Sequence, residues 1–429
     1  MAQNLAMTTT STTPAAPILP NAFDSDPVRL GWMQGSPPPA DKLIQFASGD
    51  YLSFPKSRWS LSNVRQLLPN TQVARGSAPA SPLAFAHRTD LDAVAFKTIG
   101  SNIDMTWGEA FDANYTDGIV VLHKGQIIYE KYAGALTEHG SHMAFSVTKS
   151  FVGLIGAMLV AEGQLDDTAP IPHYIPELAK SAFGNATVRQ VMDMTTGLQY
   201  SENYTDPKAE IWQHALAGGV LPKPHGYAGP ASFYEFLQTV QPMGKHGEGF
   251  TYKTINSDVL GWLIRRVTGQ SLGQVLSRRI WSRLGCEQDA YLSVDSAGTE
   301  FAGGGFSTNL RDLARFGEMM RGNGYYNGLQ IAPVAVVADI CNGANQAQFV
   351  TGGYITLPGW SYRNMWWISH NAHGAYMARG IHGQALYIDP TAEMTIARYG
   401  SHHFAGNMLI DPKSLPAYHA LAKHLIATD

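Results

Sequence analysis

AFSVTKSFVGLIGAMLVAEGQLD, residues 144–166, places a serine and a lysine three positions apart at the start of an apolar run. The run FVGLIGAMLVA is about half as long as a bilayer span requires, so it predicts a buried helix. On that helix Ser146 and Lys149 would share one face. Two interpretations are open: Ser146 caps the helix beside a solvated Lys149, or the two residues are a nucleophile and its base.

The second interpretation has a chemical basis. A serine hydroxyl is a weak nucleophile unless a neighbouring base removes its proton. Lysine can be that base if burial lowers its pKa, and the apolar neighbours Phe145, Phe151 and Val152 favour burial of Lys149. The start of a helix also presents unpaired N–H groups to a developing negative charge. Because Ser-x-x-Lys also arises by chance, the rest of the chain has to decide.

Two stretches on either side of this helix predict β-hairpins. GIVVLHKGQIIYEKY, residues 118–132, has β-rich halves joined at Lys124–Gly125, and residues 384–400 repeat the pattern around the turn DPTAE. Helical spacing occurs at residues 148–162, 187–198, 255–269, 309–324 and 415–427. These elements predict an α/β (α+β) fold in which helices flank one antiparallel sheet.

The order of the elements also predicts how the chain is divided. The sheet subdomain would comprise about residues 23–180 and 300–429, with a mostly helical lobe at about residues 181–299 inserted between them. A Thr/Ser/Ala/Pro-rich tail at residues 1–22 is expected to be disordered.

The composition excludes several classes of function. A net charge of −4 and no long basic run argue against nucleic acid as a partner. The two cysteines, Cys286 and Cys341, are expected to be buried free thiols in a reducing compartment. The N-terminal residues lack a secretory pattern, so we expect a cytoplasmic enzyme that neither spans nor binds a membrane. We expect no metal or other cofactor, because the histidines lack ligand spacing, and a homodimer is possible.

Two further segments could complete a site around Ser146. Tyr252 precedes the predicted helix 255–269, where its phenol could relay a proton between lysine, serine and leaving group. ARGIHGQALYIDP, residues 378–390, offers a strand edge whose backbone N–H could be the second donor of an oxyanion hole.

Four ordered blocks carry a resemblance to a known superfamily. They are SVTK at 146–149, MDMTTGL at 192–198, Tyr252 with its Phe-x-Tyr-x-x-x-Asn setting, and GGGFSTNLRDLARFGEMM at 303–320. Together they resemble the serine β-lactamase-like superfamily over about residues 110–400. LGWMQGSPPPADKLI and FPKSRWSLSNVRQLLPNTQVARG extend a closer similarity, to the 6-aminohexanoate-dimer (nylon oligomer) hydrolases, back to about residue 30.

The resemblance implies roles for individual residues. Ser146 would be the nucleophile, Lys149 its base and Tyr252 the proton relay. The backbone N–H groups of Ser146 and Ile381 would hold the oxyanion, and Tyr204 in SENYTDP would bind the substrate amide. Tyr200 lies close to Tyr204 and is the alternative; either tyrosine could also simply pack the loop.

The chain departs from the β-lactamase pattern at two places. Tyr252-Lys253-Thr254 replaces Tyr-x-Asn, and the Lys-Thr-Gly strand motif aligns best with Ala378-Arg379-Gly380. A second alignment, on 382–384, would move the oxyanion donor to Ala385.

The resemblance predicts a serine hydrolase that forms an acyl-enzyme with a small linear amide or carboxylic ester. Efficient β-lactamase activity is not expected, because the departures weaken the groups that hold a lactam. The alternatives are an esterase without amidase activity, a transacylase, a β-lactamase or D-alanyl peptidase, and a ligand sensor that acylates and stalls.

Overall fold

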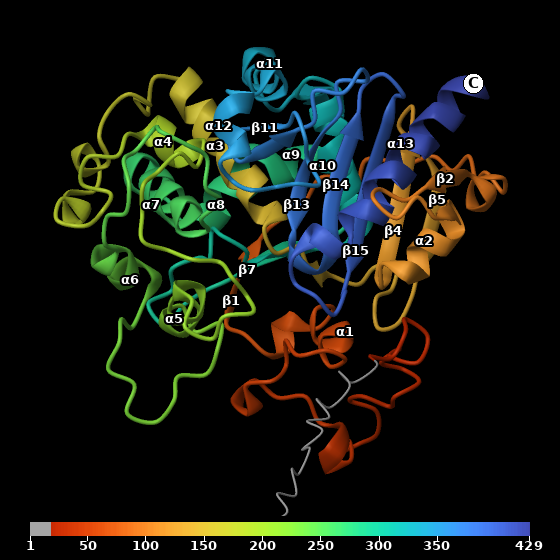
Figure 1. Ribbon diagram of the computed structural model, residues 1–429, viewed down its shortest axis with the longest axis horizontal. Coiled ribbons are helices and arrows are strands. Elements are labelled where there is room, and N and C mark those ends of the chain that lie inside the picture. The colour runs from red at the N-terminus through yellow and green to blue at the C-terminus, as the bar shows by residue number, and fades with distance from the viewer. Residues whose placement is uncertain (1–18) are drawn as a thin grey trace, which may run out of the picture.

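A seven-stranded antiparallel sheet forms the centre of the computed structural model, which describes residues 19–429 (Figure 1). Its strands run in the order β11 (Ser361–Arg363), β12 (Trp366–Ile368), β13 (Tyr376–Gly380), β14 (Gln384–Asp389), β15 (Met394–Gly400), β4 (Thr116–His123) and β5 (Gln126–Tyr132). The fold class predicted from the sequence is therefore confirmed. Most of the tail predicted at residues 1–22 lies outside the described residues.

Both predicted hairpins are present, and they join the two ends of the domain. In the first, Lys124 and Gly125 have φ values of 51° and 76°, the left-handed backbone that a tight hairpin turn requires at both central positions. The second hairpin pairs β14 with β15, and β15 then pairs with β4. Strands that lie far apart in the sequence thus pair side by side within the sheet.

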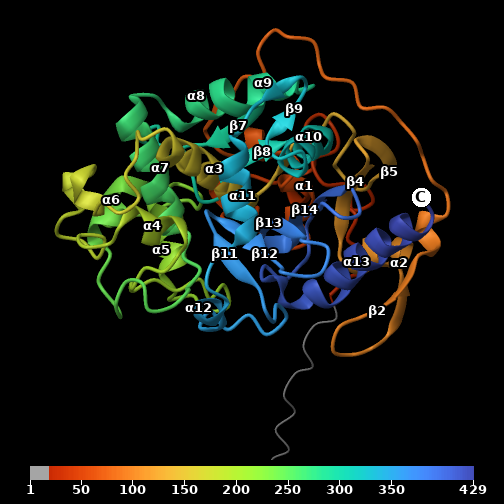
Figure 2. The same cartoon turned by 90° about the horizontal axis from the view of Figure 1, so that it is seen from above.

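Helices cover both faces of the sheet (Figure 2). One face packs against α3 (Val147–Ala161), α10 (Leu310–Arg321) and α11 (Val334–Asn342). The other is covered by α2 (Trp107–Ala113) and by the C-terminal helix α13 (Asp411–Ala427), both of which lie on the near side of the sheet in Figure 1. The predicted helix at 148–162 is α3, the central helix of the first layer.

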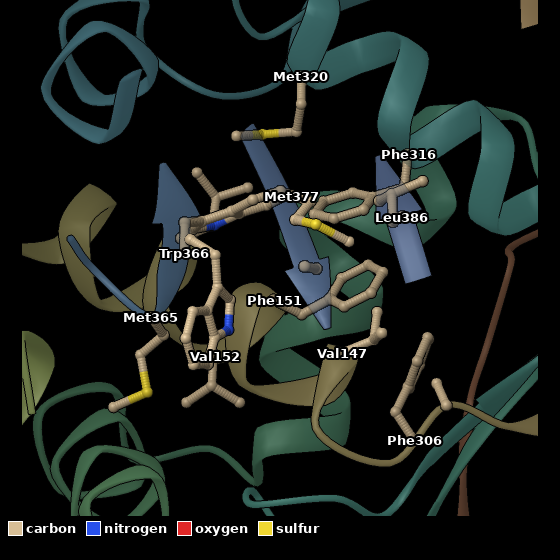
Figure 3. Close-up of a cluster of buried hydrophobic side chains, with 14 of the residues drawn as sticks. Val147, Phe151, Val152, Phe306, Phe316, Met320, Met365, Trp366, Met377 and Leu386 are labelled. Atoms are coloured by element: carbon tan, nitrogen blue, oxygen red, sulfur yellow. The ribbon is translucent and has the colours of Figure 1, made fainter. Parts of the chain in front are cut away.

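The apolar face of α3 is anchored in the main hydrophobic core (Figure 3). Phe151 stacks on Phe316 of α10 with ring centroids 3.7 Å apart, and Trp366 of β12 donates its indole N–H to the Ser150 carbonyl. Aromatic pairs add to the free energy gained from the apolar area they bury. These contacts fix the position of the first turn of α3, where Ser146 and Lys149 lie.

Most regular elements of the segment between α3 and α10 are helices, and much of the segment lies to the left in Figure 1. Its helices are α4 (Val188–Met192), α5 (Glu210–Ala217), α6 (Phe233–Thr239), α7 (Ile255–Thr268), α8 (Leu272–Leu276), the π-helical turn η7 (Ser277–Trp281) and α9 (Ser282–Leu284). One hydrophobic core runs through this segment and the sheet layers without a break. The division of the chain into a sheet subdomain and a helical lobe at 181–299 therefore stays a prediction.

A small second sheet lies beside this helical segment. Its order is β1 (Asn70–Val73), β7 (Ala290–Ser293), β8 (Phe306–Thr308) and β6 (His142–Met143). The remaining α-helices and strands of residues 19–429 are short: α1 (Ser57–Ser60), the β2–β3 pair (Ala95–Lys97, Asp104–Thr106), the β9–β10 pair (Tyr325–Tyr326, Leu329–Gln330) and α12 (Gln346–Val350). β6 leads directly into the Ser146 segment.

One predicted helix is shorter than its sequence pattern suggested. Residues 187–198 have helical spacing, but α4 ends at Met192 and Met194 has a φ of 53°. The carboxylate of Asp193 instead binds the Asn364 N–H and Arg363. These contacts with a turn far along the chain outweigh the local helical preference.

No helix within residues 19–429 combines the length and the apolar character needed to cross a bilayer.

Candidate active site

Ser146 lies at the junction of β6 and α3, where it occupies the N-cap position of α3. The residue before it, Phe145, has a φ of 44°, which bulky side chains rarely adopt. This turn leaves Ser146 partly exposed, while Phe145 and Val147 on either side are buried. Such strained backbone concentrates at functional sites, because surrounding packing has to hold it.

Lys149 is buried and points at the serine. Its side chain is 1% exposed, and its Nζ donates a 2.8 Å hydrogen bond to the Ser146 hydroxyl and another to the Gly303 carbonyl. Burial lowers the pKa of Lys149 to about 8, although the carboxylates of Glu202 and Asp258 act in the opposite direction. The amine therefore loses its proton at a lower pH than a free lysine, which helps it to act as the base for Ser146.

The alternative in which Ser146 only caps a helix beside a solvated lysine is wrong. The Ser146 side chain makes no capping hydrogen bond, and Lys149 is buried rather than solvated.

Tyr252 lies in the turn that leads into α7, within reach of both residues. The Lys149 Nζ is 5.1 Å from the centre of its ring. Burial raises the pKa of the phenol well above its usual value, Glu202 raises it further, and a hydrogen bond with Ser146 opposes the shift. Tyr252 is therefore a neutral hydroxyl in the resting site, able to donate one proton while accepting another.

Ile381 follows β13 and lines the same cavities as Ser146. The strand approaches the serine segment so closely that a Cβ added at Gly380 would lie 2.7 Å from the Ala144 carbonyl oxygen. This contact favours the alignment on Ala378-Arg379-Gly380. Ala385, the donor in the second alignment, is buried within β14 and pairs with Arg398 of β15.

The two tyrosines that the sequence left as alternatives have different surroundings. Tyr204 lines both cavities next to Ser146, and its hydroxyl lies 3.5 Å from the Glu202 carboxylate. Tyr200 is 4% exposed, with its hydroxyl 3.2 Å from Nδ1 of His214. Only Tyr204 is positioned to touch a substrate.

Glu202 is a residue of the site that the sequence analysis did not single out. Its carboxylate accepts a hydrogen bond from the Thr254 N–H at the start of α7 and lines the cavity beside Tyr252. Burial raises its pKa, and the nearby Lys149 partly offsets that shift. The feature of the sequence that could have identified Glu202 is its position in SENYTDP, two residues before Tyr204.

A second buried lysine, Lys253, lies near the Glu202 carboxylate. Lys253, between Tyr252 and Thr254, donates to the Leu198 carbonyl, and burial lowers its pKa to about 8. Lys253 thus holds the end of the segment that carries Tyr204 and Glu202.

Behind Lys149 lies a pair of buried ionisable side chains. Asp258 of α7 accepts a 3.0 Å hydrogen bond from the Gly303 N–H, and its other oxygen lies 3.0 Å from Nε2 of His214. The Gly303 carbonyl accepts from Lys149, so the hydrogen bond from the Gly303 N–H to Asp258 helps to hold the residue that positions the lysine amine. Asp258, His214 and Gly303 therefore act on the site by holding the backbone next to Lys149.

Two cavities meet at Ser146. The first, the Tyr252 cavity, has a volume of about 360 Å³, and its wall includes Tyr252, Tyr354 and Trp367. The second, the Trp212 cavity, has a volume of about 450 Å³, and its wall includes Phe145 and Trp212. Volumes of this size are typical of sites for small organic ligands. The shared residues are Ser146, Tyr204, Thr205, Ile381 and Phe404.

Comparisons with known proteins show which family the chain resembles. A family model described as Beta-lactamase matches residues 113–403. The 6-aminohexanoate-dimer hydrolase of Paenarthrobacter ureafaciens is 34% identical over 348 residues, which cover 81% of this chain and 86% of that protein. Esterase EstB of Burkholderia gladioli is 27% identical over 51% of this chain and 56% of its own length.

A solved structure gives the same relationship. A Bacillus anthracis protein assigned as a 6-aminohexanoate-dimer hydrolase superposes with a TM-score of 0.82 and 33% sequence identity, covering 91% of this chain and 99% of its own. The chain therefore belongs to the β-lactamase family, as a serine hydrolase related to 6-aminohexanoate-dimer hydrolases and esterases.

Proposed function

We propose that Ser146 is the nucleophile of an acyl-transfer reaction that hydrolyses small linear amides or carboxylic esters, as in a 6-aminohexanoate-dimer hydrolase. The observation that carries the proposal is the 2.8 Å hydrogen bond between Ser146 and the buried amine of Lys149. The names of the two related proteins support the substrate class.

The reaction would proceed in two steps. In the first, the Ser146 oxygen bonds to the substrate carbonyl carbon while its proton moves to Lys149, and the N–H groups of Ser146 and Ile381 bind the oxyanion. The tetrahedral intermediate collapses as a proton passes through Tyr252 to the leaving nitrogen or oxygen. In the second step, water attacks the acyl-enzyme, and Ser146 regains its proton.

Two matched variants test these roles. Ser146→Ala should remove essentially all turnover and leave the fold unchanged, because the side chain makes no capping bond. Tyr252→Phe keeps the ring and deletes the hydroxyl, so turnover should fall by about 100-fold or more. Intact circular dichroism spectra establish that the variants fold. Near-wild-type turnover in Ser146→Ala would refute the proposal, and near-wild-type turnover in Tyr252→Phe would make that tyrosine a packing residue.

A panel of substrates separates the alternatives. We expect cleavage of p-nitrophenyl esters and linear amide dimers, and poor cleavage of nitrocefin, because the Tyr-x-Asn amide of β-lactamases is replaced by Thr254. Hydrolysis of esters alone would identify an esterase. Acyl products formed with an added amine would identify a transacylase, and a single burst without steady turnover would identify a sensor.

We also propose that the enzyme is a cytoplasmic protein with a small-molecule substrate and no nucleic-acid or membrane partner. The net charge of −4 and two free thiols, Cys286 buried and Cys341 half-buried, support this proposal. A homodimer is part of it, and light scattering after size exclusion would reveal the mass in solution.

A further inference from the structure

The N-terminal segment, residues 44–68, contains helix α1, which lies below the main sheet in the view of Figure 1. It precedes residues 113–403, the region that matches the family model, so it is additional to that region. Its apolar side chains form a hydrophobic cluster separate from the main core. The buried members that the segment contributes to this cluster are Ile44, Tyr51, Leu61, Val64 and Leu68.

The same cluster includes residues of the active site. Phe145, which directly precedes Ser146, is one of its buried members, and Ile381 packs against it. The N-terminal segment also bonds to this region through the backbone, because the Met143 N–H of β6 donates a 2.8 Å hydrogen bond to the Leu61 carbonyl. The segment therefore packs beside both proposed oxyanion donors, which come from parts of the chain more than two hundred residues apart.

The N-terminal segment also forms part of the wall of the Trp212 cavity. Gly49, Leu52 and Ser53 line that cavity. The hydroxyl of Tyr51 donates a 2.6 Å hydrogen bond to the carbonyl of Val220, which lines the same cavity from the helical side. The segment is thus fixed against the site by two separate sets of contacts, one to β6 and one to the residues that follow α5.

These contacts bear on the geometry of the oxyanion hole. The φ of 44° at Phe145 is a conformation that persists only where the surrounding structure holds it. Donor N–H groups have to lie about 2.7–3.1 Å from the developing negative charge, and a misplacement of about 1 Å can cost about 100-fold in rate. Packing that holds the turn at Phe145 and Ile381 together is therefore packing that affects catalysis.

We propose that the N-terminal segment is a positioning element of the active site, whose cluster holds the Ser146 and Ile381 N–H groups at the spacing that binds the oxyanion. The inference rests on the proposed function of Ser146. Leu61 is the residue best suited to test it. Its side chain is buried in the cluster and lines neither cavity, so it can act on a substrate only through its neighbours.

Leu61→Ala removes part of this packing without removing a contact with the substrate. The two measurements are kcat/KM for p-nitrophenyl hexanoate and the Ki of pentylboronic acid. The boron bonds to the Ser146 oxygen while the serine proton moves to Lys149, and the resulting tetrahedral anion resembles the transition state. We expect kcat/KM to fall and Ki to rise, each by about tenfold. A loss of folded enzyme alone would leave Ki unchanged, because Ki does not depend on the folded fraction.

Three further variants serve as comparisons. Leu61→Met keeps an apolar side chain of similar volume and should restore both values to near those of the wild type. Leu421→Ala opens a cavity at a fully buried position of α13 in the main core, and should lower stability while leaving Ki unchanged. Val64→Ala makes a smaller change in the N-terminal cluster and should shift both values in the same direction as Leu61→Ala. It decides the question if Leu61→Ala does not fold.

The outcomes separate this inference from the proposed function. An unchanged Ki in the cluster variants would overturn the positioning role and leave Ser146 as the nucleophile. An equal rise of Ki in Leu421→Ala would also overturn it, because general loosening of the fold would then explain the effect. If pentylboronic acid inhibited the wild type no better than it bound to Ser146→Ala, the proposed function itself would fail, and the positioning role with it.

Discussion

The environment of Lys149 determines the pH range in which the site can work. Its amine must be neutral to accept the serine proton, so kcat/KM should rise with pH through the lysine's pKa of about 8. Burial lowers this pKa, whereas the Glu202 carboxylate stabilises the ammonium form and raises it. The acidic limb of the pH profile is thus set by two opposed effects.

Glu202→Gln removes the electrostatic effect of the Glu202 carboxylate on Lys149. Without the carboxylate the ammonium form is less stable, so the pKa of Lys149 falls and the acidic limb should move to lower pH. The measurement is kcat/KM against pH with a p-nitrophenyl ester. Glu210→Gln is the control, because Glu210 binds the Ser201 N–H in the same loop but does not perturb Lys149. An unmoved limb in Glu202→Gln would show that another group titrates there.

Tyr204 should matter more for amides than for esters. A hydrogen bond from its phenol to a substrate amide helps a poor leaving group more than an activated one. Tyr204→Phe should therefore depress hydrolysis of a linear amide more than that of a p-nitrophenyl ester, by about 1 kcal/mol in transition-state free energy. Tyr200→Phe is the control, since Tyr200 lines neither cavity. Equal losses on both substrates in Tyr204→Phe would mean that Tyr204 only shapes the loop.

At the scale of elements, the placement of helix α3 depends on a close approach to the turn between β11 and β12. A Cβ added at Gly153 would lie 2.0 Å from the Asn364 carbonyl oxygen, so only glycine fits there. Gly153→Ala should lower the free energy of unfolding by about 1–3 kcal/mol or more. It should also lower turnover, because α3 begins at the Ser146 segment.

Gly156→Ala, three residues further along α3, is the control for that prediction. At Gly156 an added Cβ would lie 3.0 Å from a terminal methyl group of Leu260, which can move, and alanine is the better helix former. Urea denaturation of the two variants gives the comparison. If Gly153→Ala were as stable as Gly156→Ala, the close approach would not limit the position of the helix.

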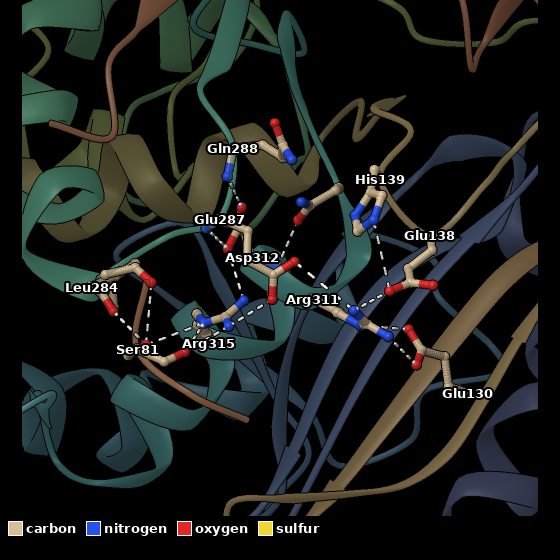
Figure 4. A network of polar contacts seen from close by, with 12 residues as sticks. Ser81, Glu130, Glu138, His139, Leu284, Glu287, Gln288, Arg311, Asp312 and Arg315 are labelled. Carbon is tan, nitrogen blue, oxygen red and sulfur yellow. Dashed lines mark hydrogen bonds and ion pairs between the residues drawn. The ribbon is translucent and has the colours of Figure 1, made fainter. Parts of the chain in front are cut away.

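For the whole molecule, a buried polar network around α10 ties distant segments together (Figure 4). Asp312 is fully buried, accepts hydrogen bonds from the N–H groups of Glu287 and Gln288, and pairs with Arg315 at 3.0 Å. Arg315 in turn binds the Ser81 carbonyl. The network therefore connects the segment before β7, helix α10 and the N-terminal part of the chain.

Asp312→Ala would leave Arg315 and two N–H groups without this partner in the interior. The free energy of unfolding should fall by about 3–5 kcal/mol. Asp104→Ala breaks an exposed pair with Lys97 and should change stability little, because water and salt screen such pairs. Equal urea midpoints for the two variants would contradict a structural role for the network.

The sequence by itself was enough to predict the local elements. The hairpin at 118–132, the helix that begins after Ser146 and the helix before which Tyr252 lies depend on side-chain periodicity and turn residues over a few positions. The three-residue spacing of Ser146 and Lys149 likewise implies that they lie on one face of a helix. Such features follow from short-range geometry, so neighbouring residues determine them.

Only the tertiary structure decided the rest. The end of α4 at Met192, the burial of Lys149, the place of Glu202 beside it and the approach of Gly380 to Ala144 all depend on residues far apart in the chain. So do the two cavities, whose walls combine the N-terminal segment, α5 and the loops around β13. Desolvation and electrostatic interaction depend on distance in space, and the chain has to fold before those distances are fixed.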